Sequence, residues 1–211
     1  MIGRQPLRDQ AYLEILARVH RGELAPGTRV RDTSLAGQLG ISRTPVREAL
    51  LRLSREGILD ADMGRGFSVC RLDPIEMRES GTILSALEVL ALRASSDVPA
   101  ERLSKLSEID RTLGTTRSDV DRTVALEEEW HRTLLQGCPN QRLRQMIDSL
   151  WQTPRRYMRA YLGAAGRVSL STQHHARIIE ALRRNDRQSA ADRLAHHWER
   201  GIEELGSWME R

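Results

Sequence analysis

The chain has 211 residues and a formal net charge of +4, and aromatic residues make up only 4% of it. This length is enough for two small domains with cores of their own. No apolar run approaches the ~20 residues of a membrane-spanning helix, and no signal segment opens the chain. The scarcity of aromatic residues argues against a surface that stacks single-stranded bases. Cys70 and Cys138 lack metal-type spacing, so we expect reduced thiols and a cytoplasmic protein.

The chain begins with a predicted amphipathic helix that ends near Arg21-Gly22. Its apolar positions are Leu7, Tyr12, Ile15, Leu16 and Val19. The sequence Ala25-Pro26-Gly27 then predicts a turn.

The stretch from Ser34 to Leu53 predicts two short helices joined by a tight turn. Leu35, Ala36 and Leu39 give the first helix an apolar face, and Gly40 suits the left-handed residue that ends a helix. The start of the second helix is indicated by Ser42 and Thr44, which are N-cap residue types, and by Pro45 in the first turn.

The second of these helices is expected to present arginines to the outside. Its apolar residues form one buried stripe, at Val46, Ala49, Leu50 and Leu53. The side chains that then face solvent are Arg43, Thr44, Arg47 and Arg52. Arginines at the start of an exposed helix suit the DNA major groove, where they pair with guanine edges or phosphates. The alternative is an ordinary helical hairpin with a solvated basic face.

Two short strands, 58–61 and 67–70, are predicted after this helix, around the tip Met63-Gly64-Arg65-Gly66. Two glycines around an arginine favour a hairpin that holds a cation against the DNA backbone or minor groove. Three helices and a two-stranded wing make a winged helix.

Residues 1–72 carry twelve arginines and eight acidic residues, whereas the remainder carries 21 basic and 21 acidic residues. The whole positive excess therefore lies on the predicted DNA-binding part.

After Leu72 the sequence loses strand alternation, and Asp73-Pro74 indicates a domain boundary. We predict two domains, 1–72 and 73–211, the second an antiparallel all-α bundle of about six helices. The predicted helices are 75–95, 100–112, 119–137, 140–162, 169–184 and 186–209. Pro154 is expected to kink or interrupt the fourth.

Histidines are concentrated in the second domain, which holds five of the six. Glu127 and His131 are one helical turn apart, and His175 and His197 lie on two further helices. Together these four side chains could close around one divalent cation, and nitrogen-rich ligation favours metals such as Zn, Ni or Co. A simple surface hydrogen bond is the alternative interpretation of such a Glu/His pair.

Three segments resemble the DNA-binding domain of the GntR family of bacterial transcription regulators: GELAPGTRV, LAGQLGISRTPVREALLRLSREGIL and GRGFSV. The resemblance implies DNA contacts by Arg43, Thr44 and Arg47 and by Gly64 and Arg65 of the wing. Thr33 stands where some members carry a DNA-contacting arginine, with Arg31 two residues earlier. The full predicted DNA-binding set is Arg31, Thr33, Ser42, Arg43, Thr44, Arg47, Gly64 and Arg65.

Two further segments resemble the FCD effector domain of the FadR-like branch: LEEEWHRTLLQGCPNQRL and HHARIIEALRRNDRQSAADRLAHHWE. This resemblance implies a metal, Zn or Ni above all, bound by Glu127, His131, His175 and His197. His174 and His196 fall outside the implied ligand set. Six helices and a short chain are similar to the VanR-like subgroup.

The resemblance also implies a small organic-acid effector, although Leu84 occupies the place of an arginine that serves the ligand carboxylate in many members. Arg155 and Arg156 are candidate replacement cations, with Arg159 nearby.

The sequence thus predicts a ligand-responsive DNA-binding regulator that resembles the GntR family. We expect it to act as a homodimeric repressor on a palindromic operator. Two alternatives stay open at this point. One is a metal-dependent enzyme that uses the His/carboxylate site, and the other is a constitutive, metal-free DNA-binding protein.

Overall fold

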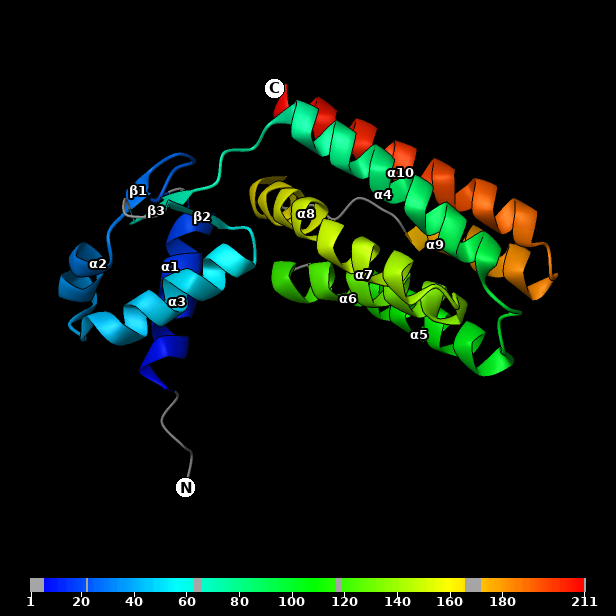
Figure 1. Cartoon of the computed structure of the whole chain (residues 1–211), viewed down its shortest axis with the longest axis horizontal. Helices are drawn as coiled ribbons and strands as arrows, with labels where there is room; N and C mark the ends of the chain where they lie inside the picture. Colours follow the sequence, from blue (N-terminus) through cyan, green and yellow to red (C-terminus); the bar gives the residue numbers. More distant parts are fainter. Residues whose placement is uncertain (1–5, 22, 63–65, 117–118, 166–171, 211) are drawn as a thin grey trace. The chain divides into compact units, whose positions relative to one another are not determined.

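The computed structural model describes residues 6–21, 23–62, 66–116, 119–165 and 172–210 (Figure 1). The chain divides into two compact units, Met1–Leu72 and Asp73–Arg211. It is mainly helical, and within the described ranges no helix is both long and apolar enough to cross a bilayer.

The first unit is a winged helix. Its elements in chain order are α1 (Leu7–His20), β1 (Arg29–Val30), α2 (Asp32–Leu39), α3 (Arg43–Arg55), β2 (Leu59–Asp62) and β3 (Gly66–Val69). The strands form an antiparallel sheet in the order β1-β3-β2. The short β1, which pairs Arg29 with Ser68, was not predicted from the sequence.

The turn between α2 and α3 has the predicted local structure. Gly40 ends α2 in the left-handed conformation at φ 65°, which a residue without a Cβ adopts at little cost. The predicted stripe of α3, from Val46 to Leu53, is buried against Ile15 and Leu16 of α1. Leu7 does not join this core, because it lies at the first residue of α1 and is half exposed.

The second unit is a helical bundle of α4 (Pro74–Ala94), α5 (Ala100–Thr115), α6 (Val120–Leu134), the 3-10 turn η1 (Leu135–Gly137), α7 (Gln141–Leu150), α8 (Gln152–Ala165), α9 (Thr172–Arg183) and α10 (Arg187–Met209). The described ranges thus hold seven α-helices where about six were predicted. The predicted fourth helix is divided at Trp151, three residues before Pro154, which lies in the first turn of α8. Seven helices in place of six therefore do not favour the VanR-like subgroup.

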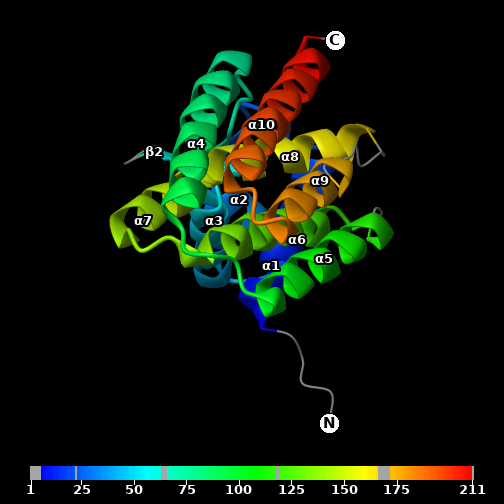
Figure 2. The ribbon, with the colours of Figure 1, turned by 90° about the vertical axis from the view of Figure 1, so that its right-hand side faces the viewer.

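The two longest helices, α4 and α10, run side by side (Figures 1 and 2). Gly81 of α4 permits this approach, because a Cβ there would lie 2.8 Å from the Cδ1 atom of Ile202 on α10. α9 packs on α5 and α10, and α6 packs on α5 and α8. This packing brings α6, α9 and α10 together around one region of the core, where Trp130, Ile178 and Leu194 are fully buried.

Candidate functional site

The N-terminal end of α3 presents the predicted DNA-reading side chains to solvent. Ser42, Arg43, Thr44 and Arg47 are all exposed, and Arg43 and Arg47 share a helix face because they are four residues apart. Arg31 and Thr33, at the start of α2, are exposed as well. The predicted wing contacts Gly64 and Arg65 lie outside the described residues.

Both recognition-helix arginines contact one carboxylate, that of Asp32. Nη2 of Arg43 lies 3.1 Å and Nη1 of Arg47 lies 3.5 Å from its Oδ2 atom. Partial burial acts to raise the pKa of Asp32, but hydrogen bonds from Arg43 and from the Thr33 N–H outweigh it and lower that pKa. The carboxylate is therefore ionised at neutral pH. Sequence reasoning did not single out Asp32.

In the helical unit, the four predicted metal ligands lie together although they come from three helices. One ligand atom each from Glu127 and His131 of α6, His175 of α9 and His197 of α10 lie within 4.8 Å of one another. Nε2 of His131 is 3.2 Å from Nε2 of His197, and Nε2 of His175 is 3.4 Å from Oε2 of Glu127. Three of these residues are buried and His197 is partly buried.

The cluster has one unsatisfied atom that a cation would satisfy. Nε2 of His175 is buried and makes no hydrogen bond with the described residues, although Oε2 of Glu127 lies 3.4 Å away. An unpaired buried ring nitrogen is costly in a folded protein. A metal ligated at this nitrogen would remove the cost, so the residues present fit a divalent transition metal.

Two carboxylates, one buried and one partly buried, contact the Nδ1 atoms of the histidines on the side away from the cluster. Oε2 of Glu88, on α4, accepts a hydrogen bond from Nδ1 of His131 at 2.6 Å, and Oδ1 of Asp110, on α5, lies 3.2 Å from Nδ1 of His175. With Nδ1 protonated in this way, the lone pair of each ring is on the Nε2 atom that faces the cluster.

Sequence reasoning assigned a role to neither carboxylate. Each, however, interrupts an apolar helix stripe: Glu88 stands among Leu84, Ala91 and Leu92, and Asp110 stands between Leu106 and Leu113. An acidic residue in a buried stripe is unusual without a partner, and this signal could have identified both.

Burial also keeps the ring nitrogens available. Burial, followed by the neighbouring histidines, lowers the pKa of His175 and of His197 well below the usual 6.5. Both imidazoles are therefore neutral at physiological pH, as metal ligation requires. The indole of Trp130 stacks on the His175 ring with centroids 3.6 Å apart and holds it in the core.

His174 and His196 are not among the four grouped ligands, although the His174 ring lies 6.1 Å from that of His197. Their rings stack on each other with centroids 5.5 Å apart, His196 is exposed, and neither belongs to the group of four.

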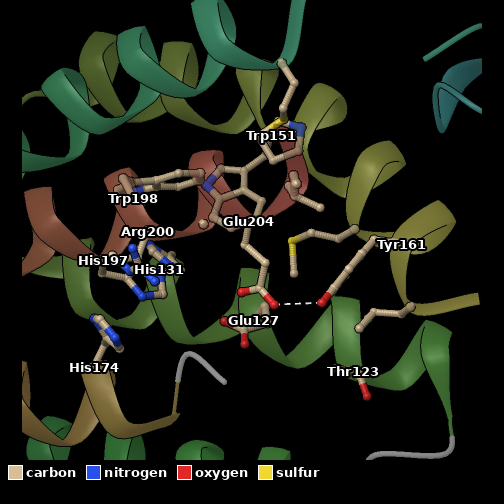
Figure 3. Close-up of a pocket in the computed structure, with 16 residues that line it drawn as sticks. Thr123, Glu127, His131, Trp151, Tyr161, His174, His197, Trp198, Arg200 and Glu204 are labelled. Atoms are coloured by element: carbon tan, nitrogen blue, oxygen red, sulfur yellow. Dashed lines mark hydrogen bonds between the residues drawn. The ribbon is translucent and has the colours of Figure 1, made fainter. Parts of the chain in front are cut away.

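A cavity of about 200 Å³ opens beside the cluster (Figure 3). Apolar side chains such as Trp151, Met158 and Trp198 line it together with Glu127, His131 and His197. At another part of the cavity the Tyr161 hydroxyl donates to Oε1 of Glu204 at 2.6 Å, as the dashed line in Figure 3 marks. The cavity therefore combines an apolar wall with the polar groups of the cluster, as small-molecule sites do.

The prediction that Arg155 and Arg156 contact an effector is not supported by the structure. Neither lines the cavity; Arg155 pairs with Glu128, and Arg156 pairs with Glu76. Arg159 is likewise paired, with Asp121. Each guanidinium thus forms an ion pair with a carboxylate on another helix. The described cation at the cavity is Arg200 of α10, which sequence reasoning did not name.

A winged helix followed by a helical unit with a cavity fits a DNA-binding transcription regulator, and the comparisons point to regulators rather than enzymes. Residues 7–69 match the bacterial regulatory proteins of the gntR family, and residues 80–200 match the FCD domain, which alone spans more than half of the chain. The chain belongs to the GntR family, in the branch that carries an FCD domain.

Relatives that are named as transcription regulators match this chain over most of their length. The HTH-type transcriptional regulator YdhC of Bacillus subtilis is 26% identical, over 97% of this chain and 93% of the relative. The HTH-type transcriptional repressor RspR of Escherichia coli is 24% identical, over 92% and 86%. The solved structure of McbR/YncC from E. coli superposes with a TM-score of 0.69 at 25% identity, covering 98% of this chain and all of that one.

Proposed function

We propose that this regulator is a homodimeric, metal-containing repressor of the cytoplasm whose affinity for a palindromic operator changes when a small molecule binds beside the metal. The observation that carries the proposal is the convergence of Glu127, His131, His175 and His197 next to a cavity in the effector-domain position. The relative RspR, which is named a repressor, supports the sign of regulation.

The metal in this proposal is Zn²⁺ or Ni²⁺. Three imidazole nitrogens and one carboxylate oxygen form a borderline donor set, which suits these ions better than Mg²⁺ or Ca²⁺. Glu88 and Asp110 supply the hydrogen bonds that orient ligating histidines in metal sites. When bound, the metal offers the cavity a positive centre for an oxygen atom of the effector, such as an organic acid.

The DNA-reading residues are Arg43, Thr44 and Arg47 on α3. Their exposure at the N-terminal end of a recognition helix supports contacts to base edges in the major groove. Ser42, Arg31 and Thr33 flank them and would reach phosphates. Gly64 and Arg65 are proposed as wing contacts on the basis of the sequence resemblance.

A second copy of the chain is the proposed partner of an exposed apolar stripe on α4. Ile83 and Leu90 are seven residues apart on one face and are each about half exposed, with values of 52% and 53%. Met146 of the adjacent α7 is 47% exposed. Large exposed side chains aligned in this way favour burial in a two-fold interface. Such a dimer would carry two winged helices, one for each half of a palindromic operator.

The function follows from coupling between cavity and dimer. An effector that prefers one arrangement of the helical units would shift the dimer toward it and change the spacing of the two winged helices. The effector can change operator affinity only by the difference in its affinity for the two arrangements.

The proposal is tested by DNA selection followed by a ligand screen. The wild-type protein selects duplexes from a randomised library, and fluorescence anisotropy measures affinity for the enriched duplex. Oxygen-bearing metabolites are then screened by thermal shift and added to the complex. We expect at least one compound to raise the melting temperature and change operator affinity, and we expect His131→Ala to lose this response while still binding DNA.

Two results would contradict the proposal. Equal responses of the wild type and His131→Ala would place the effector away from the cluster. A metal-free protein that binds the duplex with full affinity and responds to no compound would indicate a constitutive DNA-binding protein.

A further inference from the structure

The winged helix places a negative charge directly beneath its two base-reading arginines. Asp32 is the first residue of α2, eleven residues before Arg43 and fifteen before Arg47. Its Oδ2 atom contacts both guanidinium groups, at 3.1 Å and 3.5 Å. Its Oδ1 atom accepts the backbone N–H of Thr33 at 2.8 Å, which fixes the carboxylate in place.

Burial of the three side chains is unequal. The Asp32 side chain is 14% exposed, whereas those of Arg43 and Arg47 are 64% and 62% exposed. The carboxylate thus lies below the surface, and the guanidinium groups remain at it. Each contact uses one guanidinium nitrogen, and a guanidinium has five N–H donors, so donors remain for a base or a phosphate.

Fold stability gives little reason for this arrangement. Ion pairs with exposed arginines contribute little to stability, because solvent screens them and long side chains lose rotamer freedom. A carboxylate also opposes DNA binding in general, because it repels phosphates and offsets the positive charge of the arginines.

We propose that Asp32 is a specificity-determining positioning residue that holds Arg43 and Arg47 for base readout and weakens binding to non-operator DNA. This inference rests on the proposed DNA-reading role of α3. Ordering the two side chains before binding reduces the entropy lost when they meet their bases. In a non-operator duplex no base edge accepts the remaining guanidinium donors, so the negative charge of Asp32 acts only as a penalty.

The test compares two substitutions that remove the same charge. Asp32→Asn removes the shared carboxylate, and Glu48→Gln removes an exposed carboxylate from α3 that forms no ion pair with Arg43 or Arg47 in the described structure. Anisotropy gives Kd for the duplex enriched by the wild type and for a scrambled duplex of equal composition, across a salt series. The ratio of the two Kd values measures discrimination.

We expect Asp32→Asn to bind the scrambled duplex more tightly and to lose about tenfold in discrimination, the size of one base-directed contact. Glu48→Gln should strengthen both complexes alike and keep the ratio within about twofold. Asp32→Glu, which restores the charge, should recover part of the lost discrimination.

An Asp32→Asn ratio equal to that of the wild type or of Glu48→Gln, in a protein with unchanged melting temperature, would overturn the proposal. If Asp32→Asn melts early, failure of the well-folded Asp32→Glu to discriminate better than Asp32→Asn would overturn it. A wild type that enriches no duplex would instead refute DNA reading by α3, and with it the role of Asp32.

Discussion

Nδ1 of His131 donates a hydrogen bond of 2.6 Å to Oε2 of Glu88, a carboxylate with no exposed surface. The same carboxylate accepts the indole N–H groups of Trp151 at 2.9 Å and Trp198 at 2.8 Å. Three donors, one on α6, one on α10 and one at the break between α7 and α8, thus satisfy one buried carboxylate, as such a group requires. The His131–Glu88 pair joins the core of the bundle to the proposed metal ligands.

Glu88→Gln is expected to weaken metal binding by about 10–100-fold, because the hydrogen bond that orients a ligating histidine is lost or weakened. Competition with a chromophoric chelator measures the affinity. Glu129→Gln, on the same helix as His131 but half exposed and paired with Lys105, is the matched control and should keep wild-type affinity. Equal affinity in both variants would mean that Glu88 is purely structural.

Arg43→Ala and Arg47→Ala are each expected to weaken binding to the enriched duplex by roughly 1–3 kcal/mol, the range of a lost base contact. Arg65→Ala, in the predicted wing, should weaken binding evenly across sequences and flatten the salt dependence. Arg55→Ala is the control, because Arg55 lies in the last turn of α3 and its Nε donates to the Leu51 carbonyl. Unchanged affinity in both recognition-helix variants would contradict the assignment.

The winged helix could be predicted well because its signals are local. Gly40, Pro45 and the buried stripe of α3 each fix a helix end or face within a few residues. β1 could not be predicted in this way, because two residues carry no alternation and its pairing with β3 depends on residues about 40 positions away.

In the helical unit the grouping of the four candidate ligands could be predicted, and its surroundings could not. Arg155 and Arg156 were predicted to bind the effector because they are cations. The helix break at Trp151 changes the faces on which they lie, and their ion-pair partners Glu128 and Glu76 are distant in sequence. Which arginines are paired is decided by tertiary packing alone. The role of Arg200 at the cavity depends on the same packing.

Leu90→Glu is expected to convert the dimer to a monomer, because it places a charge in the apolar stripe of α4. Sedimentation at micromolar concentration should show twice the 24.0 kDa chain mass for the wild type and the chain mass for the variant. Leu13→Glu is the control, since Leu13 is also about half exposed but lies on α1 of the winged helix, outside the α4 stripe. A wild-type monomer that still binds a palindrome tightly would refute the proposed dimer.

Stability is expected to fall in alkali because of Tyr157. Burial, and then its contact with Glu76, raises the pKa of this phenol from 10 to about 12, and its hydroxyl also bonds the backbone of Asp73. A raised folded-state pKa means that the contribution of Tyr157 is complete below pH 10 and is lost as pH rises through 12.

Urea unfolding between pH 9 and pH 12 checks this expectation. The wild type should lose more stability over that range than Tyr157→Phe, which has no phenol to ionise. Tyr161→Phe controls for loss of another tyrosine hydroxyl. Parallel pH curves for the wild type and Tyr157→Phe would show that Tyr157 does not cause the loss.

The metal content of the purified protein tests the account most directly. Elemental analysis of protein prepared without a chelator should find one Zn²⁺ or Ni²⁺ per chain, and a chelator should lower the melting temperature because the metal binds the folded state. His131→Ala and His175→Ala should lose the metal, whereas His174→Ala and His196→Ala should retain it. Absence of metal from the wild type, or equal metal content in all four variants, would contradict the proposed metal centre and the effector site built on it.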